Sequence, residues 1–319
     1  MMRVLVIRHG ALGDVVLSFP AFAAIRAAHM DAEITLLTTA PFAGFLSRAP
    51  WFDRVKVDTR PAVHDLLGLF RLLRQLRGFD MVYDLQTSGR SSRYFRLAGS
   101  PRWSGIARGC AYPHANPGRD AMHTRERIEE QLAMAGIPRL PPPDLAWLRG
   151  EPVIALPDRF TALVPGAAPH RPAKRWPTGH FGALAARIGA PCVILGGKSE
   201  AALAAEIRAI APDAVDLTGR TGLGELAAVF ARADLAIGND TGPMHLAATL
   251  GVPSIVLFGA DSDPALTAPR YPDGAWPTVL RAANLADLPV DRVADAVSGR
   301  HNHPSFTLQG AKNAGDHFA

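Results

Sequence analysis

The stretch Gly238–His245 reads Gly-Asn-Asp-Thr-Gly-Pro-Met-His and separates two apolar runs. We interpret the runs as a strand and a helix, with Thr241 as N-cap and Pro243 in the first helical turn, where a missing N–H costs nothing. Gly242 lets the backbone approach a ligand, and the free amides and helix dipole suit a phosphate or diphosphate. His245 follows Thr241 by four positions and shares its face. An ordinary strand–turn–helix corner explains the pattern equally well, so both interpretations stay open here.

A second candidate is Asp14, a carboxylate that follows Gly10 and Gly13 at the start of a helical pattern. It could act as a general base that removes a proton from an attacking hydroxyl. The alternative is a first-turn acid that accepts hydrogen bonds from helix amides, the commoner role at this position. The third glycine of a dinucleotide fingerprint is missing, and the P-loop pattern occurs nowhere in the sequence. Nicotinamide chemistry and P-loop hydrolysis are therefore disfavoured.

A third candidate is the proline-stiffened loop Pro165–Pro177, which carries Arg171, Lys174 and Arg175. A positioned ammonium such as that of Lys174 could neutralise a diphosphate leaving group without a metal. A solvated basic loop is the alternative, although Trp176 favours an ordered one.

The elements that position these residues alternate between strand and helix. We expect strands at Arg3–Ile7, Glu33–Thr38, Arg54–Val57, Met81–Asp84, Thr161–Val164, Cys192–Leu195, Leu235–Ile237 and Ser254–Phe258. We expect helices at Val15–Ala28, Val63–Leu76, the end of Gln86–Leu97, His180–Ile188, Ser199–Ile210, Gly222–Arg232 and Val290–Val297. Alternation of this kind predicts an α/β fold with mostly parallel sheets, whose ligands sit beyond the carboxyl ends of the strands. The three candidates and the loop Gly196–Glu200 all follow predicted strands.

The stretch Arg139–Arg159 is rich in proline and shows no clear period, which is typical of a linker between domains. We therefore expect two Rossmann-like βαβ lobes facing across a cleft, at residues 1–150 and 151–300. The polar, aperiodic stretch 301–319 is expected to be a disordered tail, in which His301 and His303 are too isolated to form a metal site.

Composition narrows the class of protein. A hydrophobic content of 48% and a mean hydropathy of +0.07 are typical of a globular chain. No apolar run reaches the roughly 20 residues that span a bilayer, and the N-terminal segment lacks the features of a signal peptide. We therefore expect a cytoplasmic protein. Cys110 and Cys192 fall in different predicted lobes, which argues against a disulfide framework or a cysteine metal site.

The net charge of +5 is unevenly distributed. Residues 1–150 contain 20 Lys and Arg against 13 Asp and Glu, and the remainder contains 14 against 16. A basic first lobe suggests an anionic partner, such as a phosphorylated glycolipid, an acidic membrane surface or nucleic acid. A basic surface that serves only solubility explains the excess equally well.

Three motifs closely resemble glycosyltransferase family 9, the ADP-heptose:lipopolysaccharide heptosyltransferases. They are Val6–Asp14 with Pro20, Pro172–Pro177 and Gly238–His245, and the resemblance extends from Arg3 to about Val297. It implies a GT-B fold, with the acceptor on the N-terminal lobe and the nucleotide sugar on the C-terminal lobe. It also implies inverting transfer of a heptose from ADP-heptose to an inner-core sugar of lipopolysaccharide, on a Kdo-lipid or heptosyl acceptor.

The same resemblance implies that no metal or other cofactor is needed. It implies as partners a nucleotide-sugar donor and an anionic glycolipid acceptor, with peripheral contact at the inner face of the cytoplasmic membrane and no nucleic acid. By position, Asp14 matches the catalytic base. The positions that match the donor site are Lys174 at the phosphates, Glu200 at the ribose, Thr221 near the adenine, and Asp240, Thr241, Gly242 and His245 in the turn.

Some segments depart from the family pattern. The stretch between Gly166 and Lys174 is one residue longer and lacks hydroxyls, which puts donor contacts from Ala167, Ala168 and Pro169 in question. Gly259–Pro264 also differs. Residues at the acceptor site match only loosely, so a different acceptor sugar stays open.

Three rival interpretations were weighed. Asp261-x-Asp263 imitates the metal-binding motif of GT-A transferases, but a solvated loop explains so short a match better. Arg8-His9-Gly10 imitates the histidine phosphatases and leaves the second lobe unexplained. A non-catalytic nucleotide-sugar-binding protein would not need both Asp14 and Lys174.

Overall fold

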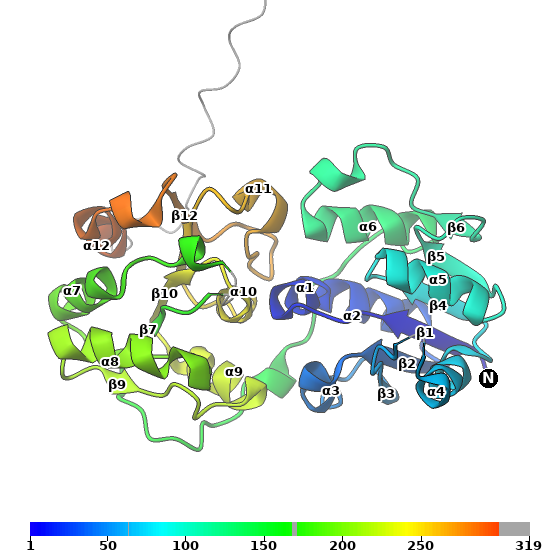
Figure 1. Ribbon diagram of the computed structural model, residues 1–319, viewed down its shortest axis with the longest axis horizontal. Helices are drawn as coiled ribbons and strands as arrows, with labels where there is room; N and C mark the ends of the chain where they lie inside the picture. Colours follow the sequence, from blue (N-terminus) through cyan, green and yellow to red (C-terminus); the bar gives the residue numbers. More distant parts are fainter. Residues whose placement is uncertain (63, 168–170, 300–319) are drawn as a thin grey trace, which may run out of the picture. The chain divides into compact units, whose positions relative to one another are not determined.

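A computed structural model describes residues 1–62, 64–167 and 171–299 of the chain (Figure 1). The chain divides into two compact units, the first Met1–Trp147 and the second beginning at Leu148. The expected tail 301–319, with His301 and His303, lies outside the described residues, as do Ala168 and Pro169. Each unit holds one six-stranded sheet in which every strand pairing is parallel, which confirms the α/β prediction.

The sheet of the first unit has the strand order β3-β2-β1-β4-β5-β6. Its strands are β1 (Arg3–Ile7), β2 (Glu33–Thr38), β3 (Arg54–Val57), β4 (Met81–Asp84), β5 (Arg102–Gly105) and β6 (Tyr112–Pro113). The chain winds outward in both directions from β1 and β4, whose register aligns Ile7 with Asp84. The loops after these two strands therefore meet at the topological switch point, where α/β sheets bind ligands.

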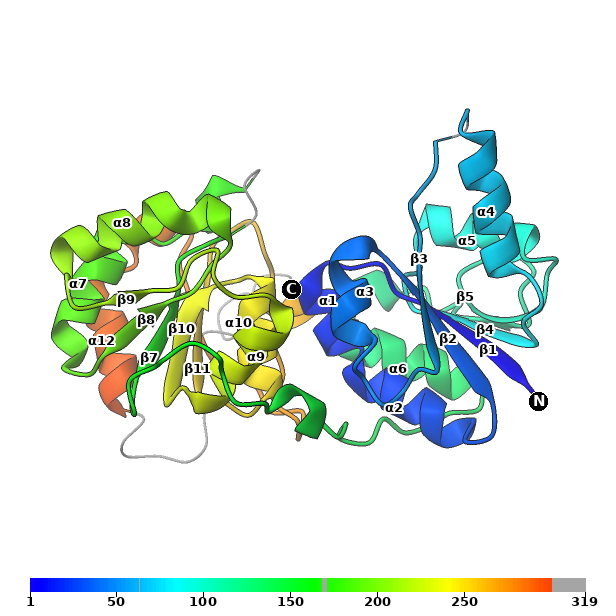
Figure 2. The same cartoon turned by 90° about the horizontal axis from the view of Figure 1, so that it is seen from below.

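Helices cover both faces of this sheet. They are α1 (Leu12–Leu17), α2 (Phe19–Ala28), α3 (Ala40–Leu46), α4 (Leu66–Leu76), α5 (Gly89–Leu97) and α6 (Thr124–Met134), with a 3-10 turn at Arg119–Ala121. Figure 2 shows α4 and α5 on one face and α2 and α6 on the other. Leu72 and Leu76 of α4 pack with Phe95 of α5 and with Leu5 and Trp103 of the sheet in one buried cluster. These contacts anchor α4 and α5 to the core.

The predicted helix Val15–Ala28 is wrong in its continuity, because Ser18 separates α1 from α2. Pro20 has no N–H to donate to the carbonyl four residues earlier, and its ring clashes with that carbonyl. The Ser18 hydroxyl donates to the Asp14 carbonyl at 2.7 Å and stabilises the break. The next predicted helix begins at Leu66, where the Asp65 side chain accepts the Gly68 amide at 2.8 Å as a cap.

The second unit repeats the architecture with the order β12-β11-β10-β7-β8-β9. Its strands are β7 (Thr161–Val164), β8 (Cys192–Ile194), β9 (Val215–Asp216), β10 (Leu235–Asn239), β11 (Ser254–Phe258) and β12 (Thr278–Arg281). Its helices are α7 (Thr178–Ile188), α8 (Ala201–Ile210), α9 (Leu223–Arg232), α10 (Gly242–Thr249), α11 (Pro264–Thr267) and α12 (Val290–Gly299), with 3-10 turns at Pro172–Lys174, Lys198–Glu200 and Leu285–Asp287. Here the switch point lies between β7 and β10.

The division between the units falls within the proline-rich stretch. Trp147 packs in the first unit against Phe45 and Trp51, with ring centroids 5.1 and 5.8 Å away. Arg149 donates to the Leu250 carbonyl of the second unit at 2.8 Å. Only Leu148 therefore lies between the anchors of the two units. No helix in the described part of the chain is long and apolar enough to cross a membrane.

Candidate functional site

Asn239, the last residue of β10, ties together the loops at the switch point of the second unit. Its fully buried side chain accepts the Trp176 amide at 2.9 Å and donates to the Pro165 carbonyl at 2.7 Å. Both ends of the basic loop Pro165–Pro177 are thus held at the turn after β10. Asn239 belongs to the Gly238–His245 stretch, but the sequence alone assigns it no role. A polar residue closing an apolar strand was the signal that could have found it.

Lys174 and Asp240 form an ion pair at this junction. The Lys174 ammonium donates to a carboxylate oxygen of Asp240 at 2.7 Å, and the two side chains are only 12% and 8% exposed. The Ser262 hydroxyl donates to the same oxygen at 2.7 Å. Because an ammonium has three donors, Lys174 can contact a second anion while it holds Asp240. Ser262 is a contact that the sequence analysis missed.

Thr241, Gly242 and His245 follow on α10. Thr241 is the N-cap with extended backbone angles, but its side chain forms no capping bond within the described residues. The expected N-cap position is therefore right, and the expected capping role of its side chain is not seen. The amide of Gly242 heads the helix, at the positive end of its dipole. His245 lies in the next turn and is buried.

Gly238 explains how closely β10 packs beside β7. A Cβ at this position would lie 2.7 Å from Val164 Cβ and 2.8 Å from both the Val164 carbonyl oxygen and Met244 Sδ. Such distances exclude a side chain. The first glycine of the motif is thus required by packing, whereas the turn that follows it faces the carboxyl edge of the sheet.

Glu200 occupies the loop after β8. Its carboxylate accepts the Gly197 amide at 2.7 Å and the Ser199 hydroxyl at 2.9 Å. A Cβ at Gly166 or at Gly196 would lie 2.8 Å from the Glu200 side chain, so both glycines make room for it. The carboxylate therefore lies beside the loop that follows β7. Because β8 and β10 flank β7 on opposite sides, Glu200 lies on the side of β7 away from β10.

Thr221 lies in the loop between β9 and α9 and is half-buried. This loop joins the Glu200 loop, because the Gly219 amide donates to the Gly196 carbonyl at 2.8 Å. The predicted donor residues thus form two groups along one carboxyl edge: Lys174 with the α10 turn, and Glu200 with the Thr221 loop.

Asp14 lies in the first turn of α1, at the switch point of the first unit. One carboxylate oxygen accepts the Ala11 amide at 3.2 Å, and the other lies 3.2 Å from the guanidinium of Arg8. The side chain is nevertheless 42% exposed. Asp14 is therefore both a helix-capping acid and an accessible carboxylate, so the two sequence interpretations do not exclude each other.

Arg8 fixes this geometry from the end of β1. Its guanidinium also donates to the carbonyls of Asp14, at 3.0 and 3.2 Å, and of Leu85, at 2.5 Å. Burial lowers the pKa of Arg8, and the negative charge of Asp14 partly offsets that effect. In the sequence, Arg8 stands out only in the phosphatase-like motif, which does not predict this role.

A polar cavity of about 110 Å³ opens beside Asp14. It is lined by Arg8, Asp14, Leu85, Gln86, Thr87, Arg119, Thr124, Arg127, Ile128 and Gln131. Arg119 is held by a bond to the Thr87 hydroxyl at 3.1 Å. Three guanidinium groups against one carboxylate favour an anionic ligand. Arg119 and Arg127 were missed because no motif distinguishes them from other arginines of the first unit.

Asp84 is fully buried at the end of β4, next to the loop that lines this cavity. Burial raises its pKa to about 7, although hydrogen bonds from Ser91 and from the amides of Thr87 and Gln86, and the charge of Arg8, act in the opposite direction. Asp84 therefore gains or loses its proton near neutral pH.

His9 points into the core of the first unit. Its Nε2 lies 3.1 Å from a carboxylate oxygen of Asp58, which also accepts the Tyr94 hydroxyl at 2.7 Å, and all three residues are buried. Burial alone would raise the pKa of Asp58, but its bonds from His9, Tyr94 and the Arg60 amide lower it overall. A histidine enclosed in this way cannot reach a phosphate ester, which argues against the phosphatase hypothesis.

Asp263 of the Asp261-x-Asp263 motif has a structural role. A carboxylate oxygen of Asp263 accepts the Ala265 amide at 3.0 Å and caps α11. Across the described ranges, no group of three or more His, Cys, Asp or Glu side chains is arranged to hold a metal ion.

Comparison with known proteins finds a family match in the second unit. The profile of glycosyltransferase family 9 (heptosyltransferase) matches residues 149–276, which hold the Lys174 and α10 elements. Lipopolysaccharide heptosyltransferase 2 of Escherichia coli is 29% identical over 304 residues, covering 84% of this chain and 85% of that protein. The chain is thus similar to glycosyltransferase family 9 over this region, and the protein is a glycosyltransferase, as its motifs predicted.

Other comparisons agree. Lipooligosaccharide heptosyltransferase 2 of Haemophilus influenzae is 31% identical over 140 residues, a match that spans 41% of this chain and 38% of that protein. The structure of an E. coli heptosyltransferase with ADP-2-deoxy-2-fluoro heptose superposes with a TM-score of 0.75 at 23% identity, covering 94% of this chain and 100% of that one. The chain thus has the GT-B fold, as predicted.

Proposed function

We propose that this family 9 glycosyltransferase moves a heptose from ADP-heptose to an inner-core sugar of lipopolysaccharide, with inversion and without a metal. The observation that carries the proposal is the Lys174–Asp240 pair at the head of α10, which offers an ammonium, a hydroxyl and an amide at one point. The E. coli heptosyltransferase with the same fold was solved with an ADP-heptose analogue.

The second unit, which begins at Leu148, holds the donor. Lys174 and the Gly242 amide neutralise the charge that grows on the diphosphate as the sugar leaves, and the Thr241 hydroxyl donates to a phosphate oxygen. Asp240 keeps the lysine extended before the donor arrives. His245, in the next turn of α10, completes the wall of the diphosphate site.

Glu200 and Thr221 bind the nucleoside. A carboxylate can accept hydrogen bonds at about four lone-pair positions, and Glu200 uses two of its own for Gly197 and Ser199. The remaining positions accept the ribose hydroxyls. Thr221 lies one loop farther along the sheet edge, beside the adenine.

The first unit, Met1–Trp147, binds the acceptor and supplies the base. Asp14 takes the proton of the acceptor hydroxyl as its oxygen attacks the anomeric carbon on the face opposite ADP. The new carbon–oxygen bond forms as the bond to the diphosphate breaks, and the electron pair leaves with ADP. Attack from the opposite face inverts the anomeric configuration. Arg8 orients Asp14, since it bonds both its carboxylate and its carbonyl.

The arginine-lined cavity beside Asp14 suits an acidic group of the acceptor. A Kdo-lipid or a heptosyl acceptor carries carboxylates or phosphates that Arg119 and Arg127 can bind. The lipid portion of such an acceptor brings the protein to the inner face of the cytoplasmic membrane.

The test is transfer by the purified protein from ADP-heptose to a Kdo-lipid acceptor in the presence of EDTA, with the product identified by mass spectrometry. We expect a heptosylated lipid. A ligand at 100 times its dissociation constant stabilises a protein by about 2.7 kcal/mol, so ADP-heptose should raise the melting temperature more than UDP-sugars do. Binding without turnover would instead favour the non-catalytic alternative, and loss of turnover in EDTA would refute metal independence.

A further inference from the structure

The outer face of α4 carries an unusual group of exposed apolar side chains. Leu66, Leu67 and Phe70 are 75%, 72% and 58% exposed. They stand within one and a half turns of a helix whose opposite face, with Leu72 and Leu76, is part of the buried core. Other large exposed apolar residues of the described chain are scattered singly: Met1, Met30, Met134, Val153 and Ile210. Such clustering indicates an interaction surface, since isolated exposed apolar residues are normal on any protein.

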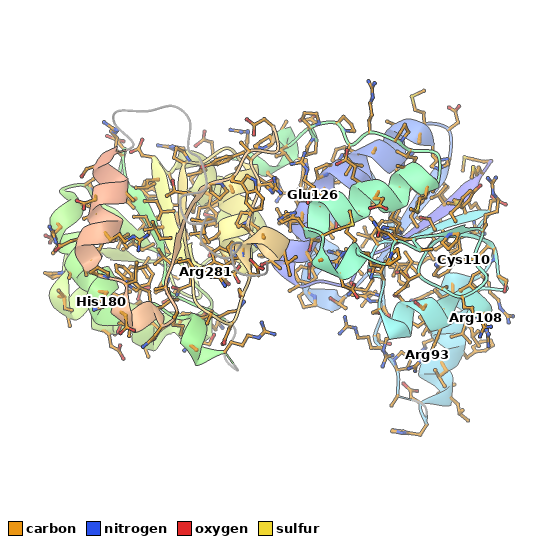
Figure 3. The ribbon with its side chains drawn as sticks, turned by 90° about the horizontal axis from the view of Figure 1, so that it is seen from above. Arg93, Arg108, Cys110, Glu126, His180 and Arg281 are labelled. Carbon is orange, nitrogen blue, oxygen red and sulfur yellow. The ribbon has the colours of Figure 1, made fainter. Side chains whose placement is uncertain are left out.

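Arginines surround this apolar group. Arg71 and Arg74 are exposed on the same face of α4, and Arg90, Arg93 and Arg96 are exposed on the neighbouring α5. The two helices contact each other, and Figure 2 shows them side by side at one edge of the unit. Figure 3 places Arg93 and Arg108 at the same end of this unit. Within the described residues, Arg71, Arg74 and Arg93 take part in no ion pair.

The charge of this segment accounts for that of the whole chain. Residues 60–108 contain nine arginines and three aspartates, an excess of six positive charges. The rest of the chain contains 25 Lys and Arg against 26 Asp and Glu, so it is almost neutral. Of the three aspartates, Asp84 is buried and Asp65 caps α4. Five of the nine arginines lie on α4 and the neighbouring α5, near the exposed leucines and phenylalanine.

We propose that the outer face of α4, together with the arginines of α5, docks the protein onto an anionic lipid bilayer. Leu66, Leu67 and Phe70 enter the boundary between headgroups and acyl chains, while the arginines contact lipid phosphates. Charge complementarity selects this partner, because exposed apolar side chains lie directly beside basic ones, the combination found on amphipathic helices that lie in a membrane interface. The inference deepens the proposed function and rests on its lipid-linked acceptor.

The test is co-sedimentation of the full chain with vesicles of equal parts phosphatidylglycerol and phosphatidylcholine, and with phosphatidylcholine vesicles alone, without donor or acceptor. We expect binding to the anionic vesicles that weakens as salt rises. Each arginine near an anionic surface contributes about a fivefold factor, so Arg71→Gln with Arg74→Gln should lower partitioning about 25-fold. Joint replacement of Leu66, Leu67 and Phe70 by serine should lower it at least tenfold.

Matched controls are available elsewhere on the surface. Arg139→Gln with Arg208→Gln removes the same charge, and Met30→Ser with Val153→Ser removes exposed apolar groups, so both should leave vesicle binding unchanged. All replaced side chains are exposed, and unchanged melting temperatures will verify folding. Equal binding to both vesicle types, or equal loss in the controls, would overturn the docking surface.

Two further readouts separate this inference from others. Transfer of heptose to a short, lipid-free acceptor should survive in the α4 variants, because Asp14 and Lys174 are intact. If such transfer fails in the parent protein while vesicle binding holds, the proposed function falls and the docking surface stands.

Light scattering tests a second copy of the chain as the occupant of this face. A parent dimer that becomes monomeric in the serine variant would refute the lipid assignment.

Discussion

The switch points of the two units share one topology but differ in their charged groups. In the second unit, one lysine and a helix N-terminus provide the positive potential, and an uncharged asparagine holds the surrounding loops. In the first unit, three guanidinium groups and an accessible carboxylate share a cavity. In the proposed mechanism, the single lysine of the second unit binds the diphosphate that leaves as ADP, and the arginines of the first unit bind an anionic group of the acceptor next to the base. Under this proposal, the same fold supports a leaving-group site in one unit and a proton-transfer site in the other.

The sharpest test of this difference is Asp14→Asn. The amide keeps the size of the side chain but cannot take a proton, so kcat should fall about 10²–10⁴-fold. Binding of ADP-heptose, measured by calorimetry, should stay unchanged because the donor site is in the second unit. An unchanged kcat would assign Asp14 to helix capping alone.

Removal of the lysine should affect the other unit. Lys174→Ala takes away the cation next to the leaving group, and we expect kcat/KM to fall about 10²–10³-fold together with weaker ADP binding. Arg175→Ala is the matched control, because its guanidinium bonds the Ala167 carbonyl and lies one residue away. If Arg175→Ala lowers kcat/KM more than Lys174→Ala does, the cation next to the leaving group is Arg175 and not Lys174.

Asn239→Leu tests whether the stability of the second unit depends on the hydrogen bonds of the Asn239 side chain. The change leaves the Trp176 amide and the Pro165 carbonyl without their partner, which should cost about 2–4 kcal/mol of unfolding free energy. Chemical denaturation of the parent and the variant measures this loss. The exposed Asn284, whose side chain caps the Leu285–Asp287 turn, provides a milder control through Asn284→Ala. Equal losses in the two variants would show that Asn239 is only a local cap.

Asp84→Asn tests the buried acid of the first unit. Because the folded protein holds this proton up to a pKa of about 7, Asp84 contributes stability below about pH 4 that is lost as the pH rises to 7. The difference between parent and variant should therefore change by up to about 4 kcal/mol over this range. Unfolding measured at several pH values gives the curve. A constant difference would mean that Asp84 ionises like an exposed aspartate.

Much of the fold follows from local patterns. Thr161–Val164 and Ser254–Phe258 were predicted with the bounds that the structure has, since buried parallel strands read as short apolar runs. The break at Ser18 was missed because the apolar period continues across Pro20. The strands β5, β6, β9 and β12 were missed as well: β6 and β9 have two residues each, and β5 and β12 mix polar and apolar residues, so only their pairing with neighbouring strands defines them.

The sequence by itself determined the two βα arrays, the turn at Gly238–His245 and the candidate roles of Asp14 and Lys174. These features depend on periodicity, caps and motifs within a few consecutive residues. Only the tertiary structure decided that Asn239 binds Trp176 and Pro165, which lie 63 and 74 residues away in sequence. It likewise placed Arg119 and Arg127 beside Asp14 and left one face of α4 exposed. A contact between distant segments depends on how strands order themselves in a sheet, and no local pattern records that order.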